Sequence, residues 1–390
     1  MNRYFLRIKT HIVSIIPYII SRLIFVFVHI DKNKFFFVSM RGGNYGDNMK
    51  SISDYVQSHH DNAIIVWGFN NDMYDKMECN HIKVKFNTFR YYYHQFTSKY
   101  FITNDGTNKY TFTKRNGHIK VQTWHGTALK RLGKDVINQD HPKWLLPFKP
   151  KAMKSELKEA DIFISGSKFM TDVFHHAYEY PRKIFETGTP RNDIFFSNRP
   201  DVILKVKKWL KIEEPNRIIL YAPTFRADNK LTYYDIDLNK IRKLFEDRWH
   251  TKYTILVRLH PSMIRQEKEF EERHLDTVGA TFYPDMQELL YASDVLITDY
   301  SSTMFDIMYS YKPVILYVPD RKTYNRGFYF DIDKLPFMVV NNNSEIDNVV
   351  SKFDENEYRK KIENFKLKIG SVEDGRAAEH VYNLMMNFPD

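Results

Sequence analysis

Two series of short apolar runs, each followed by a polar turn and a helical pattern, constrain the fold of this chain most strongly. Runs that alternate with helices in this way form parallel sheets. The first series begins near Lys34, and the second follows a charged break around residues 211–216. We therefore expect an α/β protein with two doubly wound units in series. The predicted strands are 35–38, 63–67, 100–103, 119–122 and 162–164, then 218–221, 253–257, 295–298 and 314–317.

The length of 390 residues fits two domains of ordinary size. We expect a first domain at residues 34–200 and a second at residues 201–372. Residues 373–390 contain a last helical pattern that we expect to pack back on the first domain. Hydrophobic residues make up 43% of the chain and aromatic residues 16%, which excludes disorder as a global description.

The formal net charge of +10 indicates an anionic partner, which is a nucleic acid, a lipid surface or a phosphorylated substrate. The chain has neither paired Cys/His zinc spacing nor an aromatic RNA-binding motif, so we expect no nucleic acid. Cys79 is the only cysteine, which excludes an intramolecular disulfide and a thiolate metal cluster. A reducing compartment fits this composition.

The apolar stretch from Ile12 to Ile30, within the N-terminal segment 1–33, indicates where the protein works. Pro17 and Arg22 interrupt it, which argues against a membrane-spanning helix. No small-residue cleavage site follows it, so it does not look like a removable signal peptide. We favour a basic amphipathic segment that lies in the interface of an anionic membrane, and the alternative is a helix buried in the protein.

In doubly wound units, polar residues just after the carboxyl ends of strands face the ligand. In the first unit, His125 follows a predicted strand, and Gly126 next to it permits a close approach of backbone to ligand. His125 is the best candidate for a general base, although a histidine beside Trp124 is also typical of a packed structural residue. Asp47 and Asn48 lie in a loop after the first strand and are able to contact a polyol, or they belong to a plain turn.

The second unit carries cationic and hydroxyl side chains after three of its strands. Arginine forks and helix N–H groups together suit a diphosphate, while the serine pair also fits simple helix capping. These residues are Arg226, Arg258, His260, Ser301 and Ser302.

Two D-x-D motifs, at residues 235–237 and 331–333, have the form used by metal-dependent sugar transferases. Neither follows a predicted strand in the expected way, so we expect no metal. The chain has no Walker-type phosphate loop and no G-x-G-x-x-G after a strand. We therefore expect no cofactor, neither nucleotide hydrolysis nor NAD chemistry.

Taken together, these motifs resemble the CDP-glycerol glycerophosphotransferases of teichoic acid synthesis and their relatives in capsule assembly. The segments occur in the family's order, and their combination is far more specific than any one of them. The fold that the resemblance implies is GT-B, with two Rossmann-like domains facing a cleft. The matching segments are Tyr45-Gly46-Asp47-Asn48, Trp124-His125-Gly126-Thr127 with Lys130, Gly188-Thr189-Pro190-Arg191-Asn192-Asp193, Tyr221-Ala222-Pro223-Thr224-Phe225-Arg226, Arg258-Leu259-His260-Pro261 and Ile297-Thr298-Asp299-Tyr300-Ser301-Ser302.

The resemblance implies a role for each group of residues. His125 would take the proton from an acceptor hydroxyl, which attacks the β-phosphorus of a CDP-alditol and expels CMP, with His260 as the second catalytic residue. Arg258, His260, Ser301 and Ser302 would neutralise the diphosphate. Thr224, Arg226 and Asp299 would help to hold or orient donor groups. The residues expected on the acceptor side or in the cleft are Asp47, Asn48, Trp124, Gly126, Thr127, Lys130, Arg191 and Asp193.

The partners implied are CDP-glycerol or another CDP-alditol, a lipid-linked glycan or growing polymer, and an anionic membrane. The protein would then be peripheral on the cytoplasmic face of the cell membrane. Ala128 and Phe225 depart mildly from the family pattern, and the short chain resembles the primase-type enzymes more than the long polymerases. Two other functions stay open: a GT-B glycosyltransferase with a nucleotide-sugar donor, and a non-catalytic membrane-bound protein that binds glycolipid.

Overall fold

The computed structural model describes two compact units of the chain. The first unit comprises residues up to 125, 142–193 and 372 onward, and the second comprises residues 126–141 and 194–371. The chain thus passes from one unit to the other more than once. The residues described are 18–25, 27–106, 112–136, 157–226, 231–260, 276–324 and 327–389, with 263, 269, 270, 272 and 274.

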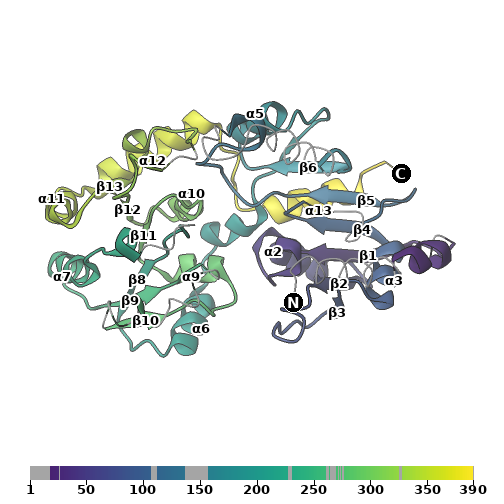
Figure 1. Cartoon of the computed structure of the whole chain (residues 1–390), viewed down its shortest axis with the longest axis horizontal. Helices are drawn as coiled ribbons and strands as arrows, with labels where there is room; N and C mark the ends of the chain where they lie inside the picture. Colours follow the sequence, from purple (N-terminus) through teal and green to yellow (C-terminus); the bar gives the residue numbers. More distant parts are fainter. Residues whose placement is uncertain are drawn as a thin grey trace, which may run out of the picture. The chain divides into compact units, whose positions relative to one another are not determined.

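The first unit is built on a seven-stranded sheet in the order β3-β2-β1-β4-β5-β6-β7, in which all neighbours pair in parallel (Figure 1). The strands are β1 (Asp31–Val38), β2 (Ile64–Phe69), β3 (Ile82–Lys85), β4 (Ser98–Thr103), β5 (Ile119–Gln122), β6 (Ile162–Ser165) and β7 (Phe185–Glu186). The helices are α2 (Asp47–His59), α3 (Phe89–Thr97), α5 (Lys168–Ala177) and α13 (Ala377–Met386), with the short turns η1 (Met40–Gly42) and η3 (Pro190–Phe196).

The second unit is built on a six-stranded sheet in the order β10-β9-β8-β11-β12-β13, which is again parallel throughout. Its strands are β8 (Arg217–Tyr221), β9 (Tyr253–Val257), β10 (Thr277–Gly279), β11 (Val295–Thr298), β12 (Val314–Tyr317) and β13 (Met338–Val340). Its helices are α6 (Pro200–Leu210), α7 (Leu238–Trp249), α9 (Met286–Ala292), α10 (Thr303–Ile307), α11 (Ile346–Ser351) and α12 (Glu355–Ile369). Its short turns are η2 (Gly133–Asp135), η4 (Leu231–Tyr234), η6 (Met308–Ser310), η7 (Ile332–Lys334) and η8 (Asn343–Glu345).

Every predicted strand overlaps an observed one, so the prediction of an α/β fold with two parallel sheets is confirmed. The central strands are visible in the sequence because they are buried on both faces and read as continuous apolar runs; Phe35, Phe36 and Phe37 in β1 are all buried. The strands that the pattern did not predict are β3, β7, β10 and β13, the edge strands of the two sheets. They are short and bury few side chains, so they leave little periodic signal.

The C-terminal helix α13 lies in the first unit, although it follows the second in sequence. Val381 and Met385 on α13 share a hydrophobic core with Met49, Ile52 and Val56 on α2. The return of the chain thus adds a helix to the first sheet's core.

The N-terminal segment is described only in part, because residues 1–17 and residue 26 lie outside the described residues. Residues 18–25 are helical, and Tyr18 and Phe25 pack on the aromatic core beside α3. Arg115 secures this helix by donating from Nη1 to the carbonyl oxygens of Phe25 (2.8 Å) and Val28 (2.9 Å). No helix in the part of the chain that the structure describes has the length and apolar character to cross a membrane.

Candidate active site

In the first unit, Asn48 joins three of the motifs that the sequence singled out. It is fully buried at the start of α2, where its Nδ2 donates to the carbonyl oxygen of Trp124 (3.0 Å) and to Oγ1 of Thr123 (3.2 Å). Its Oδ1 accepts a hydrogen bond from the backbone N–H of Arg191 (3.0 Å). One amide therefore fixes three loops that are far apart in the sequence.

Trp124 holds a strained backbone conformation directly before His125. Its φ of 56° lies in the left-handed region, which costs a non-glycine residue about 1–3 kcal/mol. The conformation is held by Asn48 at the carbonyl oxygen and by Gln122, whose Oε1 accepts from the Trp124 N–H at 2.9 Å. The indole packs on Phe174 of α5 and stacks on the His125 ring, with centroids 4.7 Å apart. These contacts define where the imidazole lies.

Burial favours the neutral form of the His125 imidazole. Burial lowers the pKa of His125, and the Arg191 guanidinium lowers it further, while the Asp47 and Asp105 carboxylates oppose the effect. Arg191 and Asp47 form a buried ion pair, with 2.8 Å between Nη1 and Oδ2. A neutral imidazole in this place is able to accept a proton.

Asp193, predicted on the acceptor side or in the cleft, is engaged with a helix instead. Its two carboxylate oxygens accept hydrogen bonds from the backbone N–H groups of Ala377 and Ala378, each at 2.9 Å. These N–H groups open α13 and have no partner within the helix, so Asp193 caps it. Burial raises the pKa of Asp193 to about 6.

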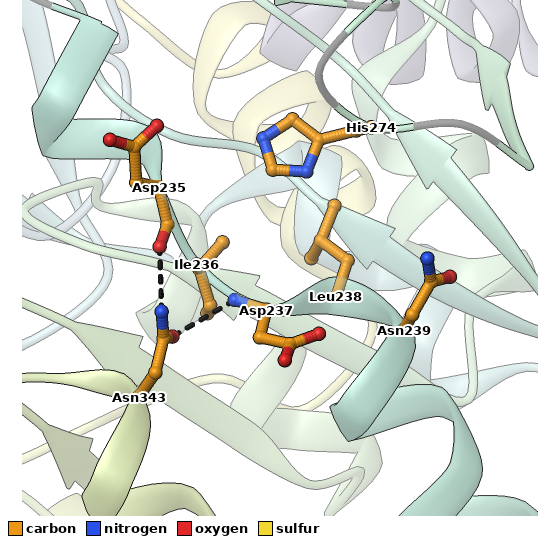
Figure 2. A pocket seen from close by; sticks show the side chains of 7 residues that line it. All are labelled: Asp235, Ile236, Asp237, Leu238, Asn239, His274 and Asn343. Atoms are coloured by element: carbon orange, nitrogen blue, oxygen red, sulfur yellow. Dashed lines mark hydrogen bonds between the residues drawn. The ribbon is translucent and has the colours of Figure 1, made fainter.

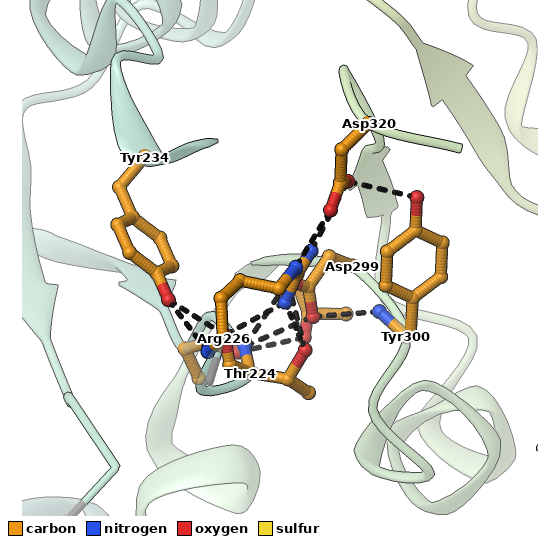
Figure 3. A network of polar contacts seen from close by, with 8 residues as sticks. Thr224, Arg226, Tyr234, Asp299, Tyr300 and Asp320 are labelled. Atoms are coloured by element: carbon orange, nitrogen blue, oxygen red, sulfur yellow. Dashed lines mark hydrogen bonds and ion pairs between the residues drawn. The ribbon is translucent and has the colours of Figure 1, made fainter. Parts of the chain in front are cut away.

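In the second unit, Thr224, Arg226 and Asp299 form a buried polar network (Figure 3). Asp299 accepts hydrogen bonds from the backbone N–H of Thr224 (3.0 Å) and from its hydroxyl (3.0 Å). Nη1 of Arg226 lies 2.9 Å from Asp299, and Nε donates to Asp320 at 2.7 Å. Although burial lowers the pKa of Arg226, the Asp320 and Asp299 carboxylates outweigh it and hold the pKa above its ordinary value. The network ties the loop after β8 to those after β11 and β12.

Asp320, Tyr300 and Tyr234 belong to this network but were not predicted as site residues. The Tyr300 hydroxyl donates to Asp320 at 3.0 Å, and the Tyr234 hydroxyl donates to the Thr224 carbonyl oxygen at 3.1 Å. Asp320 shortly follows β12, so the same strand-end rule that selected Asp299 would have found it. Tyr234 lies in η4 and has no comparable signal.

Arg258 and His260 follow β9 and differ in their surroundings. Nη1 of Arg258 donates to the carbonyl oxygens of Tyr283 (2.6 Å) and Ala280 (3.3 Å), and burial lowers the pKa of Arg258 to about 10. His260 is exposed, and its ring lies 5.8 Å from that of Phe225. Burial and the charge of Lys130 lower the pKa of His260. Arg258 thus stays cationic while His260 is neutral at pH 7.

The serines that follow β11, Ser301 and Ser302, differ from each other in their contacts. Oγ of Ser301 accepts from the Thr303 hydroxyl at 3.0 Å. Ser302 stands directly before α10 without a side-chain cap on it. Both serines are partly exposed. Of the pair, Ser301 also accepts from the backbone N–H of Thr303, the first residue of α10, at 3.4 Å.

Lys130, which the resemblance grouped with the acceptor side or the cleft, lies in the second unit with the donor-side residues. Its backbone forms an antiparallel bridge with Phe328, and Nζ lies 5.6 Å from the Tyr324 ring centroid. Its charge opposes the rise that burial imposes on the pKa of Asp299. Gly126 and Thr127 belong to the same unit, and the φ of 107° at Gly126 requires a glycine.

A cavity of about 300 Å³ lies next to the first D-x-D motif (Figure 2). Its wall includes Asp235, Asp237 and Asn343, and the Asn343 side chain hydrogen-bonds the backbone on both sides of Ile236. Asp237 caps α7 through the Lys240 N–H (2.9 Å). In the second motif, Asp333 pairs with Arg321. Within the described ranges, no group of three or more His, Cys, Asp or Glu side chains is arranged to hold a metal ion.

The sequence profile of the family described as CDP-Glycerol:Poly(glycerophosphate) glycerophosphotransferase matches residues 20–387. The chain belongs to this family. The match spans both units and all the motifs described above, so the family predicted from those motifs is confirmed.

Individual members of the glycerophosphotransferase family are similar over most of this chain. The teichoic acid glycerol-phosphate transferase of Staphylococcus aureus (strain NCTC 8325 / PS 47) is 31% identical over 90% of this chain and 92% of its own length. The teichoic acid poly(glycerol phosphate) polymerase of Staphylococcus epidermidis (strain ATCC 35984 and its equivalents) is 29% identical over 90% of this chain and 50% of its own. This chain therefore spans almost all of the S. aureus transferase and half of the S. epidermidis polymerase.

A solved structure of the wall teichoic acid polymerase TagF superposes on this family member with a TM-score of 0.81 and 28% identity. The superposition covers 98% of this chain and 96% of that one. It supports the predicted GT-B type of α/β fold.

Proposed function

We propose that this chain transfers glycerol phosphate, or a related alditol phosphate, from a CDP-alditol to a hydroxyl of a lipid-linked glycan or growing polymer in teichoic acid or capsule biosynthesis. The observation that carries the proposal is the family match over residues 20–387. The polar residues around His125 in the first unit and those that follow β8, β9 and β11 in the second unit would carry out the transfer. CMP is the second product.

The reaction needs a base for the acceptor hydroxyl, and His125 is suited to that role. As the hydroxyl oxygen bonds to the β-phosphorus, its proton passes to the neutral imidazole, and the bond from that phosphorus to the bridging oxygen breaks. The products are the phosphodiester, CMP and one proton, which His125 returns to solvent. Because Asn48 and the stack on Trp124 fix the imidazole, it needs little rearrangement to act.

On the donor side, Lys130, Arg258 and His260 with the hydroxyls of Ser301 and Ser302 would hold the diphosphate. Arg226 faces two carboxylates, so we assign it a positioning role for Thr224 and Asp299 rather than a phosphate contact. The stabilisation of charge on the leaving CMP would come from the cations and hydroxyls that remain.

We place the protein at the cytoplasmic face of the membrane through the helix at residues 18–25. One face of this helix packs on the first unit, and the opposite face exposes a row of large apolar side chains. Phe27, which follows the helix, is also exposed, at 88%. Such a face suits the boundary between lipid headgroups and acyl chains, where a lipid-linked acceptor would be found. The side chains of the row are Ile19, Ile20, Leu23 and Ile24.

The length of the product distinguishes a primase from a polymerase. We propose that this protein adds one or a few units. Mass spectrometry of the product on a defined lipid-linked disaccharide would count the units added.

The test of the function is CMP release by the purified protein with CDP-glycerol and, separately, CDP-ribitol, in the presence of a detergent-solubilised lipid-linked acceptor. We expect acceptor-dependent CMP from one donor, a loss of at least about 100-fold in His125→Ala, and normal turnover in His59→Ala, a control at an exposed histidine. Release of a nucleoside diphosphate from a nucleotide sugar would instead favour a glycosyltransferase. Absence of turnover with every donor would favour the non-catalytic alternative.

A further inference from the structure

Two reciprocal contacts join the C-terminal segment of the chain to the loop that carries Arg191. Asp193 on this loop caps α13, as described above. In the opposite direction, Glu373 accepts hydrogen bonds from the backbone N–H of Thr189 (2.9 Å) and from Nδ2 of Asn192 (3.4 Å). The loop and the segment are therefore held from both sides, and all of these residues belong to the first unit.

Two glycines make room for the Glu373 carboxyl group. A Cβ atom at Gly166 would lie 2.4 Å from Oε1 of Glu373, and one at Gly188 would lie 3.1 Å from Oε2. Both distances are shorter than ordinary carbon–oxygen contacts. Gly188 also has a φ of 85°, which side chains rarely adopt. The Glu373 carboxyl group therefore packs directly against Gly166 and Gly188, with no room for a side chain at either position.

The other side of the same loop faces His125. The backbone N–H of Arg191 donates to Asn48, and its guanidinium pairs with Asp47. Asn48 in turn holds the Trp124 carbonyl oxygen, one residue before His125. Hydrogen bonds, together with the backbone of the loop, therefore connect the C-terminal segment to Trp124, the residue before the candidate base.

We propose that Glu373 is a positioning residue for His125, acting through the loop 189–193 and Asn48. The two contacts of Glu373 restrain the loop at Thr189 and Asn192, on either side of Arg191. Loss of the Glu373 contacts would let the loop move, and Arg191 and Asn48 would follow it. The inference rests on the proposed role of His125 as the base.

The consequence can be measured at His125 itself. The charged groups that act on this imidazole are Asp47, Arg191 and Asp105, and burial is the largest influence on it. If the loop moves, water reaches the ring, so the pKa of His125 rises toward its ordinary value. A residue that served global stability alone would not produce this local change.

The experiment is an NMR titration of the imidazole carbons in the full-length protein labelled at histidine, with the His125 signal assigned from His125→Gln. In Glu373→Ala we expect the pKa of His125 to rise by about 0.5 or more. Glu373→Gln keeps an acceptor for the Thr189 N–H, so it should restore the native titration. The matched control is Asp374→Asn, at the exposed neighbour, which should also titrate as the native protein does.

Gly166→Ala perturbs the same contact while Glu373 is retained, because the added methyl carbon would lie 2.4 Å from Oε1 of Glu373 and 2.4 Å from Oγ1 of Thr189. We expect this variant to shift the His125 titration in the same direction as Glu373→Ala. A native His125 titration in folded Gly166→Ala and Glu373→Ala would overturn the proposal. If Glu373→Ala fails to fold, a native His125 titration in Gly166→Ala still overturns the proposal, because the added methyl group perturbs both Glu373 and the loop.

The activity assay then separates this inference from the proposed function. With an active native enzyme, Glu373→Ala should lower the kcat for CMP release about 10-fold and leave the KM for CDP-glycerol unchanged, because the donor residues lie in the second unit. An inactive native enzyme with a shifted His125 titration would refute the proposed function but not the positioning role. A lowered kcat without any shift would refute the positioning role alone.

Discussion

Arg226 makes contacts within the protein that its motif did not predict. An arginine after a strand was predicted to face the donor, together with Thr224 and Asp299. In the structure its guanidinium binds Asp299 and Asp320, so its fork is used to hold two loops together. Both carboxylates are buried, so their neutralisation by Arg226 stabilises the second unit.

We predict that Arg226→Leu lowers the free energy of unfolding by about 3–5 kcal/mol, because it leaves two buried carboxylates without their cation. The matched control is Arg321→Leu, which removes an exposed pair with Asp333 and should cost about 0–1 kcal/mol. Urea denaturation followed by fluorescence measures both. Equal losses in the two variants would show that the buried network does not stabilise the second unit.

Glu373 gives a prediction about pH. Burial raises its pKa from the ordinary 4.5 to about 8, so the folded state holds a proton that the unfolded state releases above pH 4.5. Its contribution to stability is therefore full below pH 4.5 and is lost as the pH rises toward 8. Glu373→Gln should flatten the fall in unfolding free energy across this range by up to about 1.4 kcal/mol per pH unit.

Urea denaturation of native protein and of Glu373→Gln at several pH values measures this effect, and only the difference between the two proteins is used. Other groups titrate in both proteins and cancel in that difference. Parallel pH profiles would mean that Glu373 is ionised in the folded state.

At the scale of elements, the segment after His125 folds as a short ladder against residues 327–329. The backbone N–H of Arg131 donates to the Gly327 carbonyl oxygen at 3.1 Å, and that of Tyr329 donates to the Leu129 carbonyl oxygen at 2.8 Å. The Tyr329 hydroxyl accepts from the Leu132 N–H (3.1 Å) and donates to Asp135 (2.8 Å). The ladder fixes Lys130 next to the aromatic ring of Tyr324.

We predict that Tyr329→Phe loosens this ladder, since both hydrogen bonds of the hydroxyl are lost at a cost of about 1–2 kcal/mol. Amide hydrogen exchange should become faster in peptides that cover residues 129–136 and 327–331. If Lys130 holds the diphosphate, the KM for CDP-glycerol should rise as well. Tyr311→Phe, which removes a hydroxyl bonded to Glu363 in the same unit, should leave the exchange of the ladder unchanged.

At the scale of the whole molecule, the exposed apolar face of residues 18–27 is the feature that most needs a partner. The side chains that anchor this helix to the first unit, Tyr18 and Phe25, are on its other face. An apolar row of this size beside a polar protein surface is typical of an interface with lipid or protein. The family's place in teichoic acid synthesis favours lipid.

We predict that the protein binds vesicles of anionic phospholipid and that the triple variant Ile19→Ser, Leu23→Ser, Phe27→Ser reduces binding about 10-fold or more, because three exposed apolar side chains are lost. Leu204→Ser and Leu367→Ser, at exposed leucines on α6 and α12, are matched controls. Vesicle co-sedimentation measures the bound fraction. Equal binding by the triple variant and the controls would exclude this face as the membrane contact.

The sequence by itself determined the fold class, the central strands, the family and the set of loops that carry polar residues. These features depend on short stretches of sequence. Strands buried on both faces are continuous apolar runs, and the polar residues that face a ligand come directly after them. The edge strands were not predicted, because a strand with one neighbour buries too few side chains to produce an apolar run in the sequence.

Only the tertiary structure decided which polar residues face one another. That Asn48 joins three loops, that Arg226 meets Asp320, and that Glu373 reaches Thr189 depends on how distant segments pack, which no local periodicity encodes. The same holds for Lys130, whose unit is set by pairing with Phe328 almost two hundred residues away. Local sequence patterns therefore determine the helices and strands, and long-range packing determines which residues at their ends come into contact.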